Sequence, residues 1–64
     1  MTTAERFQAI DNLAEKLNNG SITLTEFQKQ ATIKANGILS RSTRQMAMDR
    51  IQKIISRYLE RGGK

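Results

Sequence analysis

Five positively charged side chains near the C-terminal end of the chain are the residues whose type and spacing could do chemistry. They follow one another in steps of three and four, so on a helix they would form one edge about 21 Å long. Such a row can bind successive phosphates or the carboxylates of an acidic protein surface. The alternative is a solvated edge whose aliphatic stems cover apolar surface. The five residues are Arg50, Lys53, Arg57, Arg61 and Lys64.

The net charge of the chain is concentrated in the same segment. The formal charge is +5 at pH 7, and residues 1–37 contain as many acidic as basic side chains. The whole excess therefore belongs to residues 38–64, where Asp49 and Glu60 are the only acidic residues. On a helical wheel these two carboxylates are predicted to fall on another side and not to neutralise the basic edge. We expect an anionic partner to meet this segment first.

Residue types exclude most enzyme chemistry. The chain has no Cys and no His, which removes disulfides, thiol nucleophiles, the common zinc ligand sets and imidazole acid–base catalysis. Glu5, Asp11 and Glu15 are predicted on the solvent side of one helix, so no pair of carboxylates is placed for acid–base work. We therefore expect a non-enzymatic protein with no catalytic residue, no metal, no cofactor and no small-molecule substrate.

The chain is expected to be cytoplasmic and not to bind a membrane. Its N-terminus is polar from the first residues, and no apolar run is long enough for a signal peptide or a membrane span. A basic amphipathic helix could lie on a membrane, but Trp is absent and its apolar face is needed to close a core.

Residues 3–18 and 23–36 are predicted to form an antiparallel helical hairpin. Thr2 or Thr3 can cap the first helix, whose apolar residues recur on one face. Gly20 can adopt the positive φ that closes a helix, and Thr23 with Glu26 has the spacing of a capping box. The end of the second helix stays open around residues 36 and 37, because the apolar pattern can continue through the glycine.

A longer basic helix is predicted over residues 42–60. Its N-cap is Ser42, which would pair with Gln45 in a capping box, or alternatively Ser40. The apolar face is broad enough to pack on both earlier helices or to continue into a second subunit. The expected fold is all-α, a single domain over residues 1–64 with three helices and a frayed tail over residues 61–64. At this size a domain has a small core, so a homodimer or a complex with a larger protein is expected.

The connection between the second and third helices has two interpretations. Gly37 and the Ser and Arg residues after it have the order of a helix-turn-helix turn and recognition helix. Arg41 and Arg44, with Ser42 and Gln45, would then reach base edges or phosphates. The other interpretation, which the sequence favours, is an ordinary glycine turn followed by an N-cap, because branched Ile33 stands where a small residue is usual.

Three apolar or aromatic residues are candidates for a protein interface. Ile33 is predicted to point away from the apolar face of its helix, and Met46 lies among the basic side chains. Tyr58 is the one aromatic residue with a polar end, so it could sit at the rim of the core or across an interface. Each residue also has an alternative interpretation. Ile33 could be an isolated isoleucine on the surface, Met46 could stand among the charges by chance, and Tyr58 could pack at the rim of the core.

The corner between the first two helices resembles the SHOCT family, short bacterial domains thought to mediate oligomerisation. The pattern is a leucine-containing helix, a Gly, an Ile-Thr pair and a Glu-Phe pair that opens the next helix, and the resemblance covers about residues 10–35. If it is real, it implies self-association through Leu13, Leu17, Phe27 and their neighbours. The matching residues are Leu13, Leu17, Gly20, Ile22, Thr23, Glu26 and Phe27.

Two functions are compatible with this sequence. The first is a small regulatory or accessory protein that binds nucleic acid, DNA in preference to RNA, through the basic edge of its C-terminal helix, with Arg41 and Arg44 assisting. The second is a protein-interaction module, either a self-associating adaptor or an inhibitor that docks on an acidic protein surface.

Overall fold

The described residues form three helices joined by two short corners. A computed structural model describes residues 2–62, with α1 at Thr3–Asn18, α2 at Leu24–Asn36 and α3 at Arg41–Glu60. The predicted all-α fold is confirmed, and each helix boundary lies within one residue of its expected place. No strand occurs within residues 2–62.

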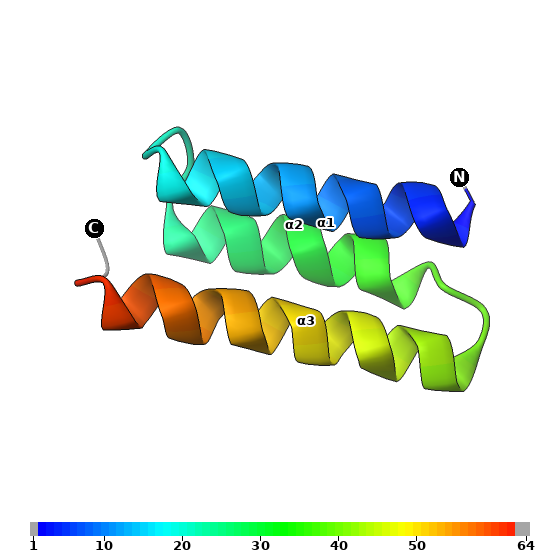
Figure 1. Cartoon of the computed structure of the whole chain (residues 1–64). Coiled ribbons are helices and arrows are strands. Elements are labelled where there is room, and N and C mark those ends of the chain that lie inside the picture. Colours follow the sequence, from blue (N-terminus) through cyan, green and yellow to red (C-terminus); the bar gives the residue numbers. More distant parts are fainter. Residues whose placement is uncertain (1, 63–64) are drawn as a thin grey trace.

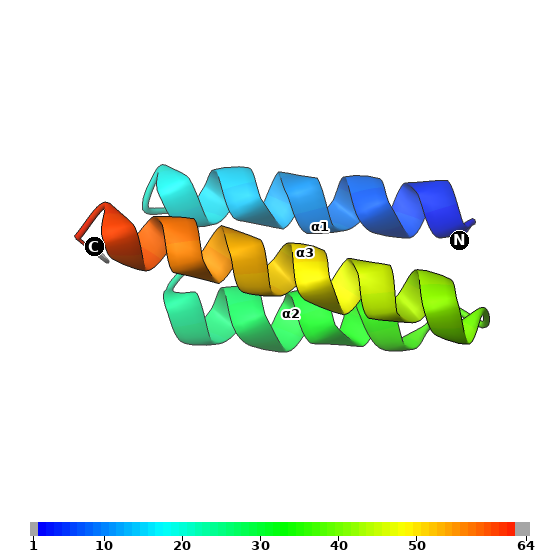
Figure 2. The ribbon, with the colours of Figure 1, turned by 60° about the horizontal axis from the view of Figure 1, so that its bottom comes forward.

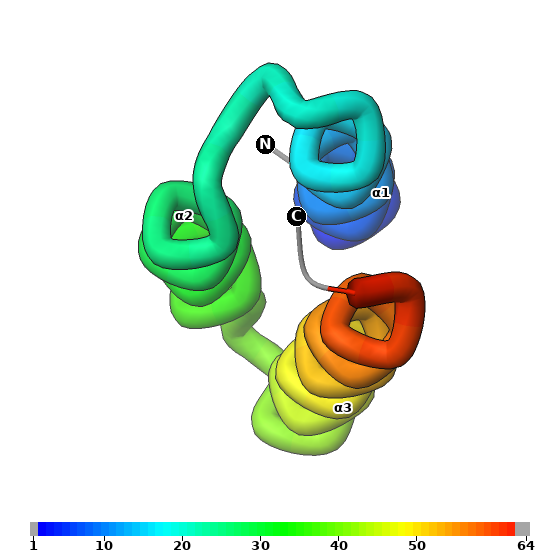
Figure 3. The backbone as a smooth tube through the Cα atoms, turned by 90° about the vertical axis from the view of Figure 1, so that its left-hand side faces the viewer, coloured from blue at the N-terminus to red at the C-terminus, as the bar shows by residue number. Residues whose placement is uncertain are grey.

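The helices run up, down and up along one long axis (Figure 1). Helices α1 and α2 are antiparallel, and α3 runs antiparallel to α2 beside both of them. Seen from the end, the three helices occupy the corners of a triangle (Figure 3). Because α2 and α3 lie nearly side by side, they do not make the steep crossing of a helix-turn-helix. The ordinary turn is the interpretation that agrees with the structure.

Local hydrogen bonds fix where each helix begins. The Thr2 hydroxyl accepts from the Glu5 N–H at 3.2 Å, and the Glu5 carboxylate accepts from the Thr2 N–H at 2.8 Å. This capping box lowers the pKa of Glu5, chiefly through the hydrogen bond from the Thr2 backbone. Thr23 caps α2 by accepting from the Glu26 N–H. The second hydrogen bond of the expected capping box would run from the Thr23 N–H to the Glu26 carboxylate. Instead, the Glu26 carboxylate accepts from the Gln30 side chain.

The start of α3 decides between the two expected caps. Ser40 is the N-cap, and its hydroxyl accepts from the Thr43 N–H. The box between Ser42 and Gln45 is wrong, because Ser42 is already inside the helix and the Gln45 side chain donates to Asp49. Because Ser40 is the N-cap, α3 begins at Arg41, one residue before the expected position.

The α1–α2 corner is closed by a glycine with positive φ. Gly20 has φ +83°, and the N–H groups of Ser21 and Gly20 donate to the carbonyls of Lys16 and Leu17 at 2.8 and 3.3 Å. These two bonds make a Schellman motif, which satisfies carbonyls that the end of the helix leaves unpaired. A residue with a Cβ at position 20 would be strained.

Gly37 at the α2–α3 corner lies against a side chain from α1. Gly37 has φ −77°, which any residue can adopt, and it ends α2 directly after Asn36. The Arg6 guanidinium from α1 lies where a Cβ of residue 37 would be, and its Nη1 donates to the Lys34 carbonyl at 3.2 Å. A side chain from α1 thus packs against the end of α2, and Ile38 follows this end into the core.

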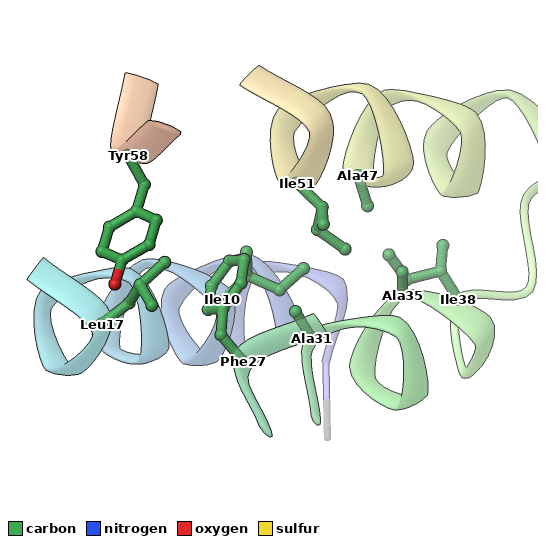
Figure 4. Close-up of a cluster of buried hydrophobic side chains, with 9 residues drawn as sticks. All are labelled: Ile10, Leu17, Phe27, Ala31, Ala35, Ile38, Ala47, Ile51 and Tyr58. Carbon is green, nitrogen blue, oxygen red and sulfur yellow. The ribbon is translucent and has the colours of Figure 1, made fainter. Parts of the chain in front are cut away.

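One small apolar core lies between the three helices (Figure 4). Alanines contribute one third of its nine buried residues, so the helices can approach closely where these meet. Helix α1 packs most closely on α2 and least closely on α3. The buried side chains are Ile10, Leu17, Phe27, Ala31, Ala35, Ile38, Ala47, Ile51 and Tyr58.

Tyr58 belongs to this core. Its side chain extends from α3 toward Leu17 of α1, and the residue is only 8% exposed (Figure 4). This burial agrees with the interpretation that Tyr58 packs with the core. Leu17 and Phe27, through which the SHOCT resemblance implies self-association, are also fully buried within this chain.

Candidate nucleic-acid interface

The predicted basic row forms an exposed edge of α3 on its α1-facing side. We call Arg50, Lys53, Arg57 and Arg61 the cationic edge, and all four are exposed. Core residues Ala47, Ile51 and Tyr58 occupy the neighbouring stripe of α3, which holds this edge at the surface. In Figure 2, α3 lies in front of the boundary between α1 and α2, so its outer side is uncovered. Lys64 lies outside the described residues.

Three members of the cationic edge are available to a partner. The side chains of Lys53, Arg57 and Arg61 make no hydrogen bond or ion pair with any residue in the range 2–62. They are spaced four residues apart, so successive charges are about 6 Å apart along the helix axis. Their guanidinium and ammonium groups can therefore donate hydrogen bonds to a partner without breaking a side-chain contact within the described part of the chain.

Arg50 is occupied by a carboxylate from α1. Its Nε donates to Asp11 Oδ1 at 2.8 Å, and its Nη2 donates to Asp11 Oδ2 at 2.9 Å. The paired carboxylate raises the pKa of Arg50, which is charged at every physiological pH in any case. Exposed ion pairs of this kind contribute only about 0–1 kcal/mol, so a competing anion can replace Asp11.

Two acidic residues lie closer to the cationic edge than the sequence indicated. Asp11 was expected on the solvent side of its helix, but it is half-buried at the boundary with α3. Asp49 was expected on another side of α3, but it lines one surface hollow together with Arg50 and Lys53. These carboxylates reduce the positive potential at the Arg50 end. At the other end, the Arg57 and Arg61 side chains make no ion pair within residues 2–62, and exposed Glu60 is the acidic residue beside them.

Two shallow hollows follow the boundary between α1 and α3. Phe7 and Met46 supply apolar surface to the first, and Ala14 and Ile54 supply it to the second. Arg50 and Lys53 line both of them. They occur where α1 and α3 pack least closely, so an apolar floor lies directly beside the charged edge.

Arg41 and Arg44 do not join the cationic edge. Arg44 is half-buried, and its Nη1 donates to the Ile38 carbonyl at 3.0 Å, so it closes the α2–α3 corner. Arg41 is exposed, but it lies nine residues before Arg50, which is two and a half helical turns and places it on the opposite side of α3. From the sequence, Arg41 and Arg44 were expected to assist the basic edge in binding, and the geometry does not support this expectation.

The remaining interface candidates lie apart from one another. Met46 is 63% exposed and borders the cationic edge, where it lines the first hollow. Ile33 is 53% exposed on the outer face of α2, beside polar residues. Sequence reasoning missed Phe7 and Asp11 as residues of the α1–α3 boundary. Their spacing to Ala14, of seven and three residues, was the available signal that they share one margin of α1.

The described residues show no other chemical centre. Within residues 2–62, no group of three or more acidic side chains is placed to hold a metal ion. No helix in that range is sufficiently long and apolar to cross a membrane.

Comparisons with protein-family models, with curated protein sequences and with solved structures find no match to this chain. The similarity of the α1–α2 corner to SHOCT domains therefore stays a hypothesis. The geometry of the cationic edge is the basis on which a function can be argued.

Proposed function

We propose that this protein binds duplex nucleic acid, DNA in preference to RNA, through the cationic edge of α3. The observation that carries the proposal is the exposed series Lys53, Arg57 and Arg61, which follows α3 to its C-cap and whose side chains have no partner within residues 2–62. The three charges lie within about 12 Å along the helix axis, and duplex DNA carries one negative charge per about 1.7 Å of its own axis. Long, flexible Lys and Arg side chains at this spacing can each reach a phosphate.

Binding of this kind is electrostatic and largely independent of sequence. Phosphate contacts release condensed counterions, and each neutralised phosphate adds about −0.9 to the slope of log K against log salt. Three free cations predict a slope of roughly −3, and Arg50 adds about one more if phosphate displaces Asp11. Affinities in the range of about 10⁻⁴–10⁻⁶ M are typical of such non-specific binding.

The test is a charge-matched pair of double variants. Lys53→Gln with Arg57→Gln removes two members of the cationic edge, and Lys16→Gln with Lys29→Gln removes two exposed lysines from α1 and α2. Both variants lose the same net charge, so their difference reports position alone. Fluorescence anisotropy with a labelled duplex is measured from low to moderate salt. The edge variant should bind about tenfold or more weakly than the control and lose roughly two units of salt slope.

Three results would contradict the proposal. The first is equal binding by the two double variants, which would leave only the net charge as the cause. The second is binding of the original protein that does not weaken with salt. The third is a failure to bind duplex DNA at low salt, where electrostatic affinity is greatest.

The apolar hollows favour a second candidate, an acidic protein partner. Phe7 and Met46 offer apolar contacts beside Arg50 and Lys53, a combination that suits an amphipathic helix with acidic flanks. A synthetic acidic amphipathic peptide can replace DNA in the same titration. Met46→Gln then separates the candidates, because it should weaken binding of the peptide and leave binding of duplex DNA unchanged.

A further inference from the structure

One of the two hollows between α1 and α3 is lined by three basic side chains. Arg50, Lys53 and Arg57 of α3 belong to its wall, and Asp11 of α1 is the acidic residue beside them. Steps of three and four residues place the three cations on one side of α3, within about 10.5 Å along its axis. Long Lys and Arg side chains can close such a span, so all three charged groups can reach one anion. We call this the three-cation hollow.

The Asp11 carboxylate holds Arg50 in place and leaves part of its guanidinium free. Arg50 donates to Asp11 through Nε at 2.8 Å and through Nη2 at 2.9 Å. A guanidinium has five N–H donors, and within residues 2–62 the two on Nη1 have no acceptor. An anion in the three-cation hollow can therefore bind Arg50 while Asp11 stays in place.

The floor of the three-cation hollow is apolar. Ala14 of α1 and Ile54 of α3 form it, and both are half-buried against the core. The hollow is lined by α1 and α3 alone, and in the end view these two helices lie on one side of the bundle and α2 on the other (Figure 3). An apolar floor lowers the local dielectric constant and strengthens the attraction between the cations and an anion above it.

The charge of the three-cation hollow matches a phosphate monoester better than a phosphodiester. The three cations and the Asp11 carboxylate give it a net charge of +2. A phosphate monoester carries about −1.5 to −2 charges at pH 7 and has three strong acceptor oxygens, one for each basic side chain. A phosphodiester within a strand carries one negative charge. In DNA, a phosphate monoester occurs at the end of a strand.

We propose that the three-cation hollow binds the terminal phosphate of a DNA strand, so that this protein prefers phosphorylated duplex ends. The inference rests on the proposed function, because the rest of the strand follows the cationic edge. Arg61 lies about one helical turn beyond Arg57 and is not part of the hollow. It is therefore placed to meet the next phosphate of the same strand.

Two duplexes of one sequence test the terminal phosphate. They differ only in having a phosphate or a hydroxyl at both 5′ ends, so the ratio of their affinities cancels binding to the interior. Fluorescence anisotropy at low salt and about pH 7.5 should show about three- to tenfold tighter binding of the phosphorylated duplex, because its end carries extra charge into the hollow.

The preference for the phosphorylated duplex should become smaller at about pH 5.5. The second pKa of a phosphate monoester is about 6, so the terminal phosphate loses much of its second charge there. The charged groups that face it are Asp11, Arg50, Lys53 and Arg57, and the chain has no His with an ordinary pKa in this range. Both duplexes meet the same protein at each pH, so a change in their ratio reports the phosphate.

Arg57→Gln and Arg61→Gln are a matched pair of variants. Each removes one exposed arginine whose side chain has no partner within residues 2–62, but of the two only Arg57 lines the three-cation hollow. Arg57→Gln should lower the ratio of the two affinities at least about twofold. Arg61→Gln should weaken binding of both duplexes alike and leave the ratio unchanged. Unchanged circular dichroism shows that both variants fold.

Thymidine 5′-monophosphate distinguishes a DNA end from a free nucleotide as the source of the phosphate. It should bind at least about tenfold more weakly than the phosphorylated duplex, because it has no further phosphate to meet Arg61. Equal or tighter binding of the nucleotide would overturn the assignment to a DNA end.

The remaining outcomes separate this proposal from the proposed function. Equal affinity for the two duplexes would overturn the terminal-phosphate site and leave binding along the cationic edge intact. A preference that persists in Arg57→Gln, or that is the same at both pH values, would also overturn it. If neither duplex binds at low salt, both proposals are wrong.

Discussion

The Asp11 carboxylate decides how much of the cationic edge is available to an anionic partner. Arg50 and Arg57 occupy the same edge of α3 and are both exposed, yet only Arg50 is paired with α1. The pair is solvent-accessible, so it competes with phosphate without excluding it. The Asp11 carboxylate therefore weakens the attraction of anions to one end of the edge, and its removal is informative.

We expect Asp11→Asn to strengthen binding of duplex DNA. The substitution frees the Arg50 guanidinium and removes a negative charge from the boundary between α1 and α3. One additional phosphate contact should increase affinity roughly three- to tenfold at low salt and steepen the salt slope by about one unit. The same anisotropy titration measures both quantities.

Glu15→Gln is the control for that substitution. Glu15 is exposed on α1, its side chain makes no hydrogen bond or ion pair within residues 2–62, and its loss changes the net charge by the same amount. If Glu15→Gln strengthened binding as much as Asp11→Asn, the Arg50 pair would have no specific role.

Contacts of single residues across helices were the part that the sequence could not predict. The wheel of α1 places Asp11 about 40° from Phe7 and about 60° from Ala14, but it does not reveal that α3 packs on that margin. Arg44 looked like a candidate for nucleic-acid contact, because nothing local shows that it binds the Ile38 carbonyl. Tyr58 was correctly placed on the apolar face, whereas its burial depends on Leu17 and on the path of α1.

The helices themselves were predictable, because their ends are set by neighbouring residues. Thr2, Thr23 and Ser40 each accept from the N–H three residues later, and Gly20 closes α1 with positive φ. These interactions span three to five residues, so they are visible in the sequence. The end of α2 was ambiguous for the opposite reason, because its contact comes from a distant part of the sequence. The Arg6 guanidinium of α1 donates to the Lys34 carbonyl and lies beside Gly37.

The capping box of α1 predicts a dependence of stability on pH. The folded state lowers the pKa of Glu5 below its unfolded value, through hydrogen bonds with Thr2. The ionised carboxylate therefore stabilises the folded state fully above the unfolded pKa of about 4.5, and this contribution is lost as the pH falls through the lower folded pKa. Glu5→Gln should unfold at a lower urea concentration than the original protein at pH 7.

The difference in stability toward urea between the original protein and Glu5→Gln should vanish in acid. Once Glu5 is protonated, it no longer has a charge that the first turn of the helix stabilises. Urea unfolding followed by circular dichroism at pH 7 and at about pH 2.5 measures the difference at both ends of this range. If the difference in urea stability were equally large in acid, the carboxylate charge would not be its cause.

The complete bundle divides the surface of its longest helix. Ala47, Ile51 and Tyr58 of α3 close the core, and the cationic edge lies exposed beside α1. Contacts with α1 and α2 make this division, because α3 alone is an amphipathic helix with a broad apolar face. The core that holds the arrangement contains only nine buried residues, of which three are alanines.

A core of this size cannot lose its largest fully buried side chain. Phe27 is fully buried between the three helices, and replacement of a buried Phe by Ala typically costs about 3–5 kcal/mol. A domain of this length rarely has more than about 3–5 kcal/mol of stability. Phe27→Ala should therefore abolish the cooperative thermal transition in circular dichroism, whereas Ile33→Ala on the exposed face of α2 should change stability by no more than about 0.5 kcal/mol. A Phe27→Ala protein that melts near the original temperature would mean that the three helices do not depend on this shared core.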